Sequence, residues 1–178
     1  MNRIHHLGTL AAAAPLCLVS SLALAHVTLE PQPAAIGSTY KAVLRVAHGC
    51  EGEPTLKLRV QIPEGVIAVK PMPKAGWELN TVETPYKQSY DYHGAPTTEG
   101  VREIVWTGKL LDKHYDEFVF RAFLTDGLKP DTMLYFPVVQ ECAGGKADRW
   151  IEIPAEGRKA DDYKSPAPGV RLRPKVTD

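Results

Sequence analysis

Short segments in which apolar and polar residues alternate follow one another along most of this chain. In residues 56–62, an aliphatic residue at every second position is separated from the next by Lys57, Arg59 and Gln61. Alternation with a period of two is typical of a strand that is buried on one face. The same or a shorter pattern predicts further strands at residues 40–46, 66–69, 77–82, 103–107, 117–124, 133–140 and 149–153.

Turn-forming residues separate these segments. Most of the 15 prolines and 14 glycines fall between the alternating runs. No helical periodicity extends beyond a turn or two, so we expect no helix of three turns or more in residues 26–154. Many short strands at regular spacing predict an all-β domain, a β-sandwich of immunoglobulin or fibronectin-III type with seven or more strands.

The first 25 residues have a different pattern. Arg3 is their only charged residue, an apolar run covers residues 7–24, and the segment closes on Ala23-Leu24-Ala25. Small residues at the first and third positions before a cut are what signal peptidase accepts. The pattern therefore predicts a signal peptide cleaved after Ala25, and a periplasmic or secreted protein that begins at His26. The alternative is an uncleaved membrane anchor, although polar and helix-breaking residues interrupt the run.

Removing 25 of the 178 residues leaves 153, about the length of one domain. Without Arg3, 20 basic residues face 21 acidic ones, and this balance predicts no nucleic-acid partner. No second apolar run is long enough to span a bilayer, so we expect no membrane span in the mature protein. Residues 155–178 are rich in Lys, Arg, Asp, Pro and Ala; they are interpreted as a mostly flexible tail or, alternatively, a final strand after the domain at 26–154.

Two cysteines remain after processing, Cys50 and Cys142. Thiols of exported proteins pair in an oxidising compartment, which predicts a Cys50–Cys142 disulfide. The alternative is a thiolate metal site, but the two cysteines are far apart and neither belongs to a CxxC motif.

His26 is a candidate metal ligand because processing gives it two donor nitrogens. An α-amine has a reference pKa of about 8, so a metal displaces its proton easily at neutral pH. The amine and the imidazole Nδ1 then form a chelate within one residue, a tetragonal arrangement that suits Cu(II). The alternative is that a histidine stands at this position by chance.

Five segments of the mature chain, in order, resemble the YcnI-like copper-binding domain family. They are His26-Val27-Thr28-Leu29-Glu30-Pro31, residues 46–50 with the following strand to Pro63, Val105-Trp106-Thr107-Gly108, Tyr115-Asp116-Glu117-Phe118 and Trp150-Ile151-Glu152-Ile153-Pro154. The resemblance implies a fibronectin-III-like sandwich and a role in copper handling at the cell envelope. It also implies a Cu(II) site built on the processed N-terminal histidine, a carboxylate and a nearby tryptophan.

Carried over residue by residue, the resemblance assigns the histidine to His26 and the tryptophan to Trp150, which is otherwise a core or edge aromatic. The family's glutamate follows the strand that here ends at Val46, where this chain has a longer loop instead. Glu51 is one candidate for the third ligand. His48 is slightly favoured, because it would give a three-nitrogen site; the ordinary interpretations are a backbone-bonded histidine and a solvated carboxylate.

If neither loop residue binds metal, Asp148 or Glu152 beside Trp150 is the next candidate. We expect a non-catalytic protein that buffers Cu(II) or delivers it to another envelope copper protein. The alternatives are an oxidative enzyme with a histidine-brace copper and a metal-free interaction sandwich. No Ser-His-Asp order, phosphate-binding loop or HExxH motif is present, so no catalytic residue is assigned.

Overall fold

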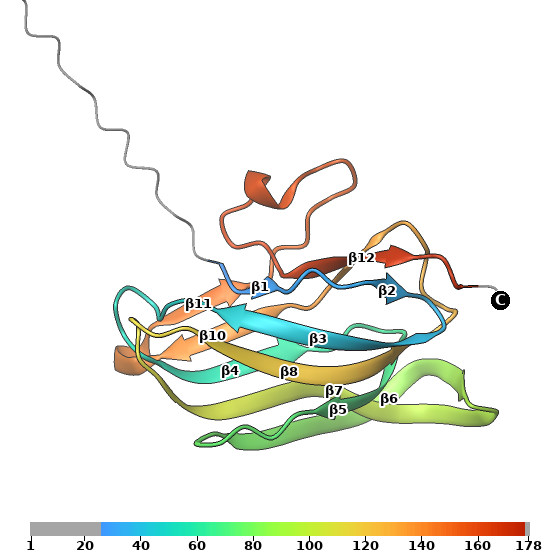
Figure 1. Cartoon of the computed structure of the whole chain (residues 1–178), viewed down its shortest axis with the longest axis horizontal. Coiled ribbons are helices and arrows are strands. Elements are labelled where there is room, and N and C mark those ends of the chain that lie inside the picture. Colours follow the sequence, from blue (N-terminus) through green and yellow to red (C-terminus); the bar gives the residue numbers. More distant parts are fainter. Residues whose placement is uncertain (1–25, 177–178) are drawn as a thin grey trace, which may run out of the picture.

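A computed structural model describes residues 26–176 as a two-layer β-sandwich with a small third sheet (Figure 1). The predicted signal peptide, residues 1–25, lies outside the described residues. Within them there is no α-helix, and the two short 3-10 segments are η1 (Ala143–Gly145) and η2 (Ala160–Asp162). The predicted all-β sandwich is confirmed.

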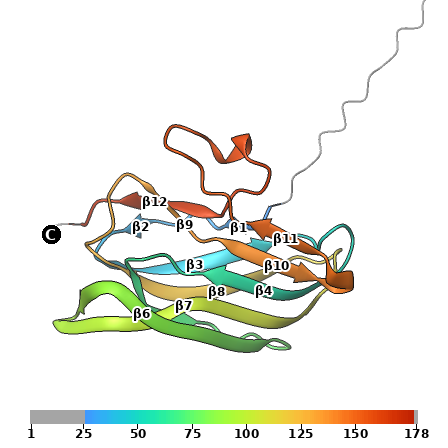
Figure 2. The same ribbon diagram turned by 180° about the vertical axis from the view of Figure 1, so that it is seen from behind.

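The two layers are a four-stranded and a five-stranded sheet, and the view from behind shows the larger sheet in front (Figure 2). In spatial order, the smaller sheet contains β1 (Thr28–Leu29), β3 (Ser38–Val46), β8 (Asp116–Leu124) and β5 (Val66–Pro71). The larger sheet contains β11 (Ala147–Trp150), β10 (Val138–Cys142), β4 (Thr55–Gln61), β7 (Ala95–Leu110) and β6 (Glu78–Tyr92). The third sheet contains β2 (Ala34–Ala35), β12 (Gly169–Arg173) and β9 (Met133–Tyr135).

The core lies between the two layers and follows the alternation seen in the sequence. Leu58 and Val60 of β4 are fully buried, whereas Arg59 between them is exposed. Trp106 is fully buried and packs edge-on against Phe118 with ring centroids 5.5 Å apart. Trp77 is half-buried and also packs edge-on against Phe118, with ring centroids 4.8 Å apart.

The single strand predicted at residues 133–140 is wrong, because the chain forms two strands there. β9 ends at Tyr135 and β10 begins at Val138, and the two belong to different sheets. Pro137 has no amide hydrogen for a sheet ladder, so it marks the point where the chain changes sheets. The strand predicted at 149–153 begins earlier and ends at Trp150.

The strands predicted at 77–82 and 103–107 are the inner parts of a much longer hairpin, β6 and β7. Most residues of β6 are exposed, and its outer half buries only Tyr86 and Tyr90, four positions apart, so no period-two alternation reveals it. His93 and Gly94 turn the chain at the tip with φ of 55° and 83°. Only glycine adopts such angles freely, which explains the position of Gly94.

Residues 155–178 include β12, the final strand considered as an alternative to a flexible tail. β12 pairs antiparallel with β9 and parallel with β2, and Val170 and Leu172 are buried. The loop before it stands off the sheets on the same side as β1 (Figure 1). In the part of the chain described here, no helix is long and apolar enough to cross a membrane.

Candidate metal site

The imidazole of His26 lies against the indole of Trp150. The ring centroids are 5.0 Å apart and the planes meet at 64°, an edge-to-face contact. The Nε2 atom of His26 is buried and has no hydrogen-bond partner among the described residues. Trp150 is 7% exposed at the end of β11, on the edge of the larger sheet. The structure thus brings together the two residues predicted to form the centre of the site.

The first strand sets the position of His26 relative to the loop that carries the other candidates. In the antiparallel pair of β1 and β3, Thr28 lies opposite Arg45 and Leu29 opposite Leu44. Continued by two residues in the same register, this pairing sets His26 opposite Ala47, the residue before His48. The loop after Val46 therefore begins beside the first residue of the predicted mature chain.

A disulfide fixes this loop to the larger sheet. Cys50 and Cys142 are joined with an S–S distance of 2.00 Å and a Cα–Cα distance of 5.9 Å, which confirms the predicted pairing. The loop also folds back on itself, because Cys50 and Glu53 exchange backbone hydrogen bonds of 3.1 and 3.0 Å. The backbone N–H of Gly49 donates to Asp112 at 2.9 Å, and a Cβ at Gly49 would clash with the Glu53 carbonyl. The loop is a tight, anchored turn.

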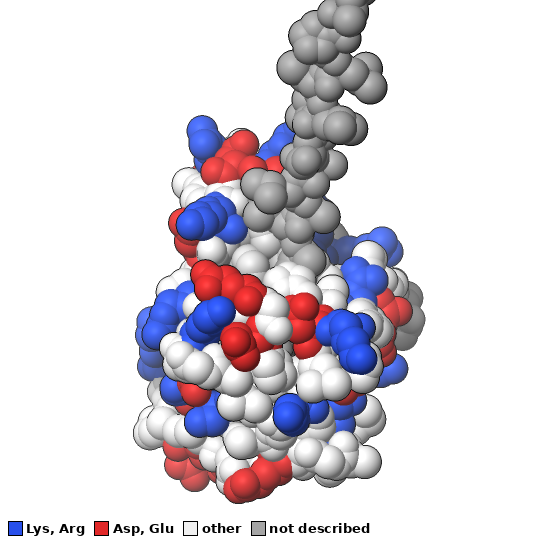
Figure 3. All heavy atoms as spheres, turned by 90° about the vertical axis from the view of Figure 1, so that its left-hand side faces the viewer, with Lys and Arg blue, Asp and Glu red and all other residues white. Residues whose placement is uncertain are grey.

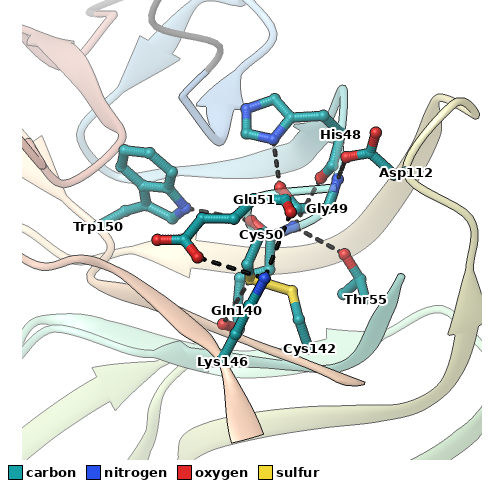
Figure 4. Close-up of a disulfide and its surroundings, with 10 residues drawn as sticks. All are labelled: His48, Gly49, Cys50, Glu51, Thr55, Asp112, Gln140, Cys142, Lys146 and Trp150. Atoms are coloured by element: carbon teal, nitrogen blue, oxygen red, sulfur yellow. Dashed lines mark hydrogen bonds and ion pairs between the residues drawn. A yellow bond between two sulfur atoms is a disulfide. The ribbon is translucent and has the colours of Figure 1, made fainter. Parts of the chain in front are cut away.

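The two predicted loop ligands have different surroundings (Figure 4). Nδ1 of the half-buried His48 is engaged with the backbone carbonyl of Gly49, as in the ordinary interpretation of that residue. The side chain of Glu51 is 79% exposed, and its carboxylate forms an ion pair with Lys146 at 3.3 Å. Glu51 has a φ of 49°, so its backbone occupies the left-handed region at the tip of the turn.

Gln140, which sequence reasoning missed, connects the loop to Trp150. Its Nε2 donates to the His48 carbonyl and to Thr55 Oγ1, both at 2.7 Å, and its Oε1 accepts from Trp150 Nε1 at 3.2 Å. Its place at an inward position of a predicted strand was a signal, since a polar residue there requires buried partners.

Asp148 and Glu152, the next candidates for the third ligand, also have different surroundings. Asp148 lies opposite Gln140 in the β10–β11 pair, two residues before Trp150, and therefore on the same face of the sheet as both. Glu152 instead binds the loop before β12, where its carboxylate accepts from the Ser165 N–H at 2.5 Å. Within residues 26–176, no group of three or more His, Cys, Asp or Glu residues is close enough together to hold a metal ion.

The surroundings of His26 are open on one side. A groove of about 460 Å³ runs from His26 along β1 to Met133, Tyr135 and the loop before β12. At the end of the sandwich seen in Figure 3, acidic side chains gather near the start of the described chain, with lysines and arginines beside them. The structure contains ion pairs between Glu51 and Lys146 at 3.3 Å and between Asp116 and Lys74 at 2.6 Å.

Comparison with known proteins agrees with this architecture. A solved structure described as an uncharacterized protein from Nocardia farcinica with an immunoglobulin-like fold superposes with a TM-score of 0.63 at 20% identity, covering 83% of this chain and 98% of that one. The molecule is thus an immunoglobulin-like β-sandwich protein. No curated protein matches it. The chain belongs to the family described as "Domain of unknown function (DUF1775)", which matches residues 26–172.

Proposed function

We propose that this protein, once processed to begin at His26, binds Cu(II) at the cell envelope and buffers it or passes it to another envelope copper protein. The observation that carries the proposal is the placement of His26. Its ring is held edge-on against Trp150, beside an anchored loop that carries further donors.

The chemistry of His26 fits Cu(II) after processing. In the precursor, the nitrogen of His26 belongs to a peptide bond and offers no basic lone pair. Cleavage after Ala25 turns it into an amine beside imidazole Nδ1, and two nitrogens on one residue suit tetragonal Cu(II). With its ring held by Trp150, the chelating residue has less rotational freedom to lose on binding.

Two sequence observations support processing and export. The family match begins at residue 26, directly after the small-residue motif that ends at Ala25. Five segments from His26 to Pro154 resemble the YcnI-like copper-binding domains, and this finer assignment within the DUF1775 family is part of the proposal. A periplasmic or secreted location follows from it.

We propose Glu51 as the third donor, with His48 as the competing candidate. An exposed ion pair such as Glu51–Lys146 contributes only about 0–1 kcal/mol, so the carboxylate is redirected at little cost. His48 must give up its contact with the Gly49 carbonyl if Nδ1 is to bind. If Glu51 binds the metal, Lys146 competes with it, and Lys146→Met should raise the affinity for Cu(II).

The test is a Cu(II) titration of four proteins: the mature form, the same form with one extra glycine before His26, His26→Ala and His93→Asn. We expect tight binding only by the mature form and by His93→Asn. His93 is the matched control because it lies at the hairpin tip, where asparagine tolerates its positive φ. Equal affinity in the glycine-extended protein would refute the chelate.

The same titration of Glu51→Gln and His48→Ala assigns the third donor. A loss confined to Glu51→Gln supports the carboxylate, and a loss confined to His48→Ala supports a three-nitrogen site. If both variants bind as the mature protein does, the turn does not contribute, and Asp148→Asn is the next variant to titrate because it shares a sheet face with Trp150.

A further inference from the structure

Gln140 is a deeply buried polar side chain beside the proposed site. It is 1% exposed in β10, yet three of its hydrogen-bonding positions are filled. The two donors of its amide reach the His48 carbonyl and Thr55, and its oxygen accepts from the Trp150 indole (Figure 4). A single side chain therefore joins the loop beside His26 to the aromatic ring against which His26 packs.

We infer that Gln140 is a positioning residue of the copper site, an inference that rests on the proposed function. The hydrogen bonds of the Gln140 side chain go to Trp150, Thr55 and the His48 carbonyl, so Gln140 acts on His26 through Trp150 and the His48 loop. The indole N–H is the only polar group of Trp150 and donates only, so its one hydrogen bond fixes how the ring is turned. The face that the ring offers to His26 is fixed with it.

An amide is the side chain that this position requires. The His48 carbonyl and the indole N–H have opposite needs, one for a donor and the other for an acceptor, and an amide offers both. An ionised carboxylate offers acceptors only, and an aliphatic side chain offers neither. The Cys50 sulfur also lies 3.6 Å from the Gln140 carbonyl oxygen, so backbone and side chain of this residue both face the anchored loop.

Gln140 thereby couples the two walls of the site, which are the His48 loop and the Trp150 ring. With Gln140 in place, a shift of the His48 loop and a turn of the Trp150 ring each break a buried hydrogen bond, which is costly in an apolar interior. Without it, the ring and the loop relax independently. Residues that orient metal ligands from outside typically change metal affinity by about 10–100-fold when they are replaced.

The experiment compares Gln140→Leu, Gln140→Glu and Thr55→Val with the mature protein. Gln140→Leu removes every bond. Gln140→Glu keeps nearly the same shape and an acceptor for the indole, but an ionised carboxylate has no donor for the His48 carbonyl. Thr55→Val is the matched control, because it removes another hydrogen bond of Gln140 from an equally buried residue but leaves both walls of the site attached.

Two readouts separate positioning from folding. Without copper, the indole N–H resonance of Trp150, assigned with Trp150→Phe, should shift and exchange faster with solvent in Gln140→Leu, while those of Trp77 and Trp106 stay unchanged. With copper, affinity should fall about tenfold or more in Gln140→Leu, less in Gln140→Glu, and less than about threefold in Thr55→Val.

Each outcome decides a different point. An unchanged Trp150 indole resonance in Gln140→Leu, or unchanged copper affinity in a mature protein that binds copper, overturns the inference. If Gln140→Leu does not fold, Gln140→Glu decides by the same two readouts. If the mature protein itself binds no copper, the proposed function fails first and this inference falls with it, whatever the variants do.

Discussion

Two polar side chains tie loops to strands in this sandwich, and they do so by different means. Gln140 joins the His48 loop to Trp150, and Glu64, in the turn between β4 and β5, joins that turn to the β6–β7 hairpin. Each has three recorded partners: those of Glu64 are the Lys87 N–H at 3.0 Å, the Tyr90 hydroxyl at 2.8 Å and the Arg102 guanidinium at 2.9 Å. The number of hydrogen bonds is the same, but the chemistry is not.

The difference lies in burial and charge. The Glu64 and Arg102 side chains are 25% and 24% exposed, so water and salt reach the ion pair and weaken it. Gln140 is neutral and almost inaccessible, so its bonds are unscreened and no water replaces them if they break. In the hairpin tie, both oxygens of the Glu64 carboxylate already have hydrogen-bond partners. The Gln140 tie instead holds Trp150, the ring against which His26 packs, and so adjoins the proposed site.

The largest expected loss of stability comes from the disulfide that anchors the Gln140 end. The bridge spans 92 residues of sequence, and replacing both cysteines with alanine should lower the free energy of unfolding by about 4–5 kcal/mol at most, in the chain-entropy description. Urea denaturation of the double variant Cys50→Ala/Cys142→Ala measures it. A loss below about 1 kcal/mol would mean that the sheets hold the His48 loop without the bridge.

Gln140→Leu should have the next largest effect, about 3 kcal/mol, because it leaves the His48 carbonyl and the Trp150 N–H buried without partners. The measurement is the urea concentration at the midpoint of unfolding, compared between proteins whose unfolding free energy depends on urea with the same slope. Added salt should leave this loss unchanged, since no charge is removed. A loss that disappears in 1 M salt contradicts the assignment of this tie as neutral and buried.

Glu64→Gln should cost less, about 1 kcal/mol, because the pair it breaks is partly exposed. Its effect should shrink as sodium chloride is raised from 0.05 to about 1 M, where the screening length is only about 3 Å. Arg102→Gln is the matched variant, and the two changes combined should cost less than their sum. If Glu64→Gln destabilises as much as Gln140→Leu, the contrast between the two ties is wrong.

The smallest expected effect at neutral pH belongs to Tyr40, whose buried hydroxyl has no hydrogen-bond partner among residues 26–176. Tyr40→Phe should change stability by less than about 0.5 kcal/mol at pH 7, because it breaks no hydrogen bond seen in that part of the chain.

Alkaline pH should separate Tyr40→Phe from the wild type. Burial raises the pKa of Tyr40 to about 12, and nearby Glu30 adds to the shift. Burial of Tyr40 favours its neutral form in the folded protein, so its folded-state pKa lies above the ordinary value of 10. The contribution of neutral Tyr40 to folding stability is therefore complete below pH 10 and is lost as pH rises towards 12. Unfolding measured between pH 8 and 12 should therefore show a steeper alkaline decline for the wild type than for Tyr40→Phe. Parallel declines would contradict the shift.

The sequence predicted the inner strands well because one face of each is buried. Residues 40–46 and 56–62 alternate and coincide with most of β3 and β4, although Leu56 is exposed. It failed where burial leaves little pattern: the outer part of β6 buries only Tyr86 and Tyr90, and the apolar run at 133–140 hides the change of sheet at Pro137. Sheet pairing and crossover depend on contacts between distant segments, which local alternation does not encode.

The candidate site was predictable to the extent that chemistry marks residues individually. His26, Trp150 and the cysteines stand out by type and position, and the structure brings the histidine and tryptophan together and joins the cysteines. Gln140, Thr55 and Lys146 did not stand out, because an isolated Gln, Thr or Lys has many ordinary roles. The roles of Gln140 and Thr55 arise from the pairing of β4, β10 and β11, and that of Lys146 from its ion pair with Glu51, which only the folded chain shows.

Pulsed electron paramagnetic resonance of Cu(II) bound to mature protein with ¹⁵N-labelled histidine shows whether His26 supplies two of the copper donors. We expect strong couplings from two inequivalent nitrogens of His26, its amine and its imidazole. These couplings should be lost when one unlabelled glycine precedes that residue. A copper spectrum identical in the mature and glycine-extended proteins would contradict a site built on the processed N-terminal histidine.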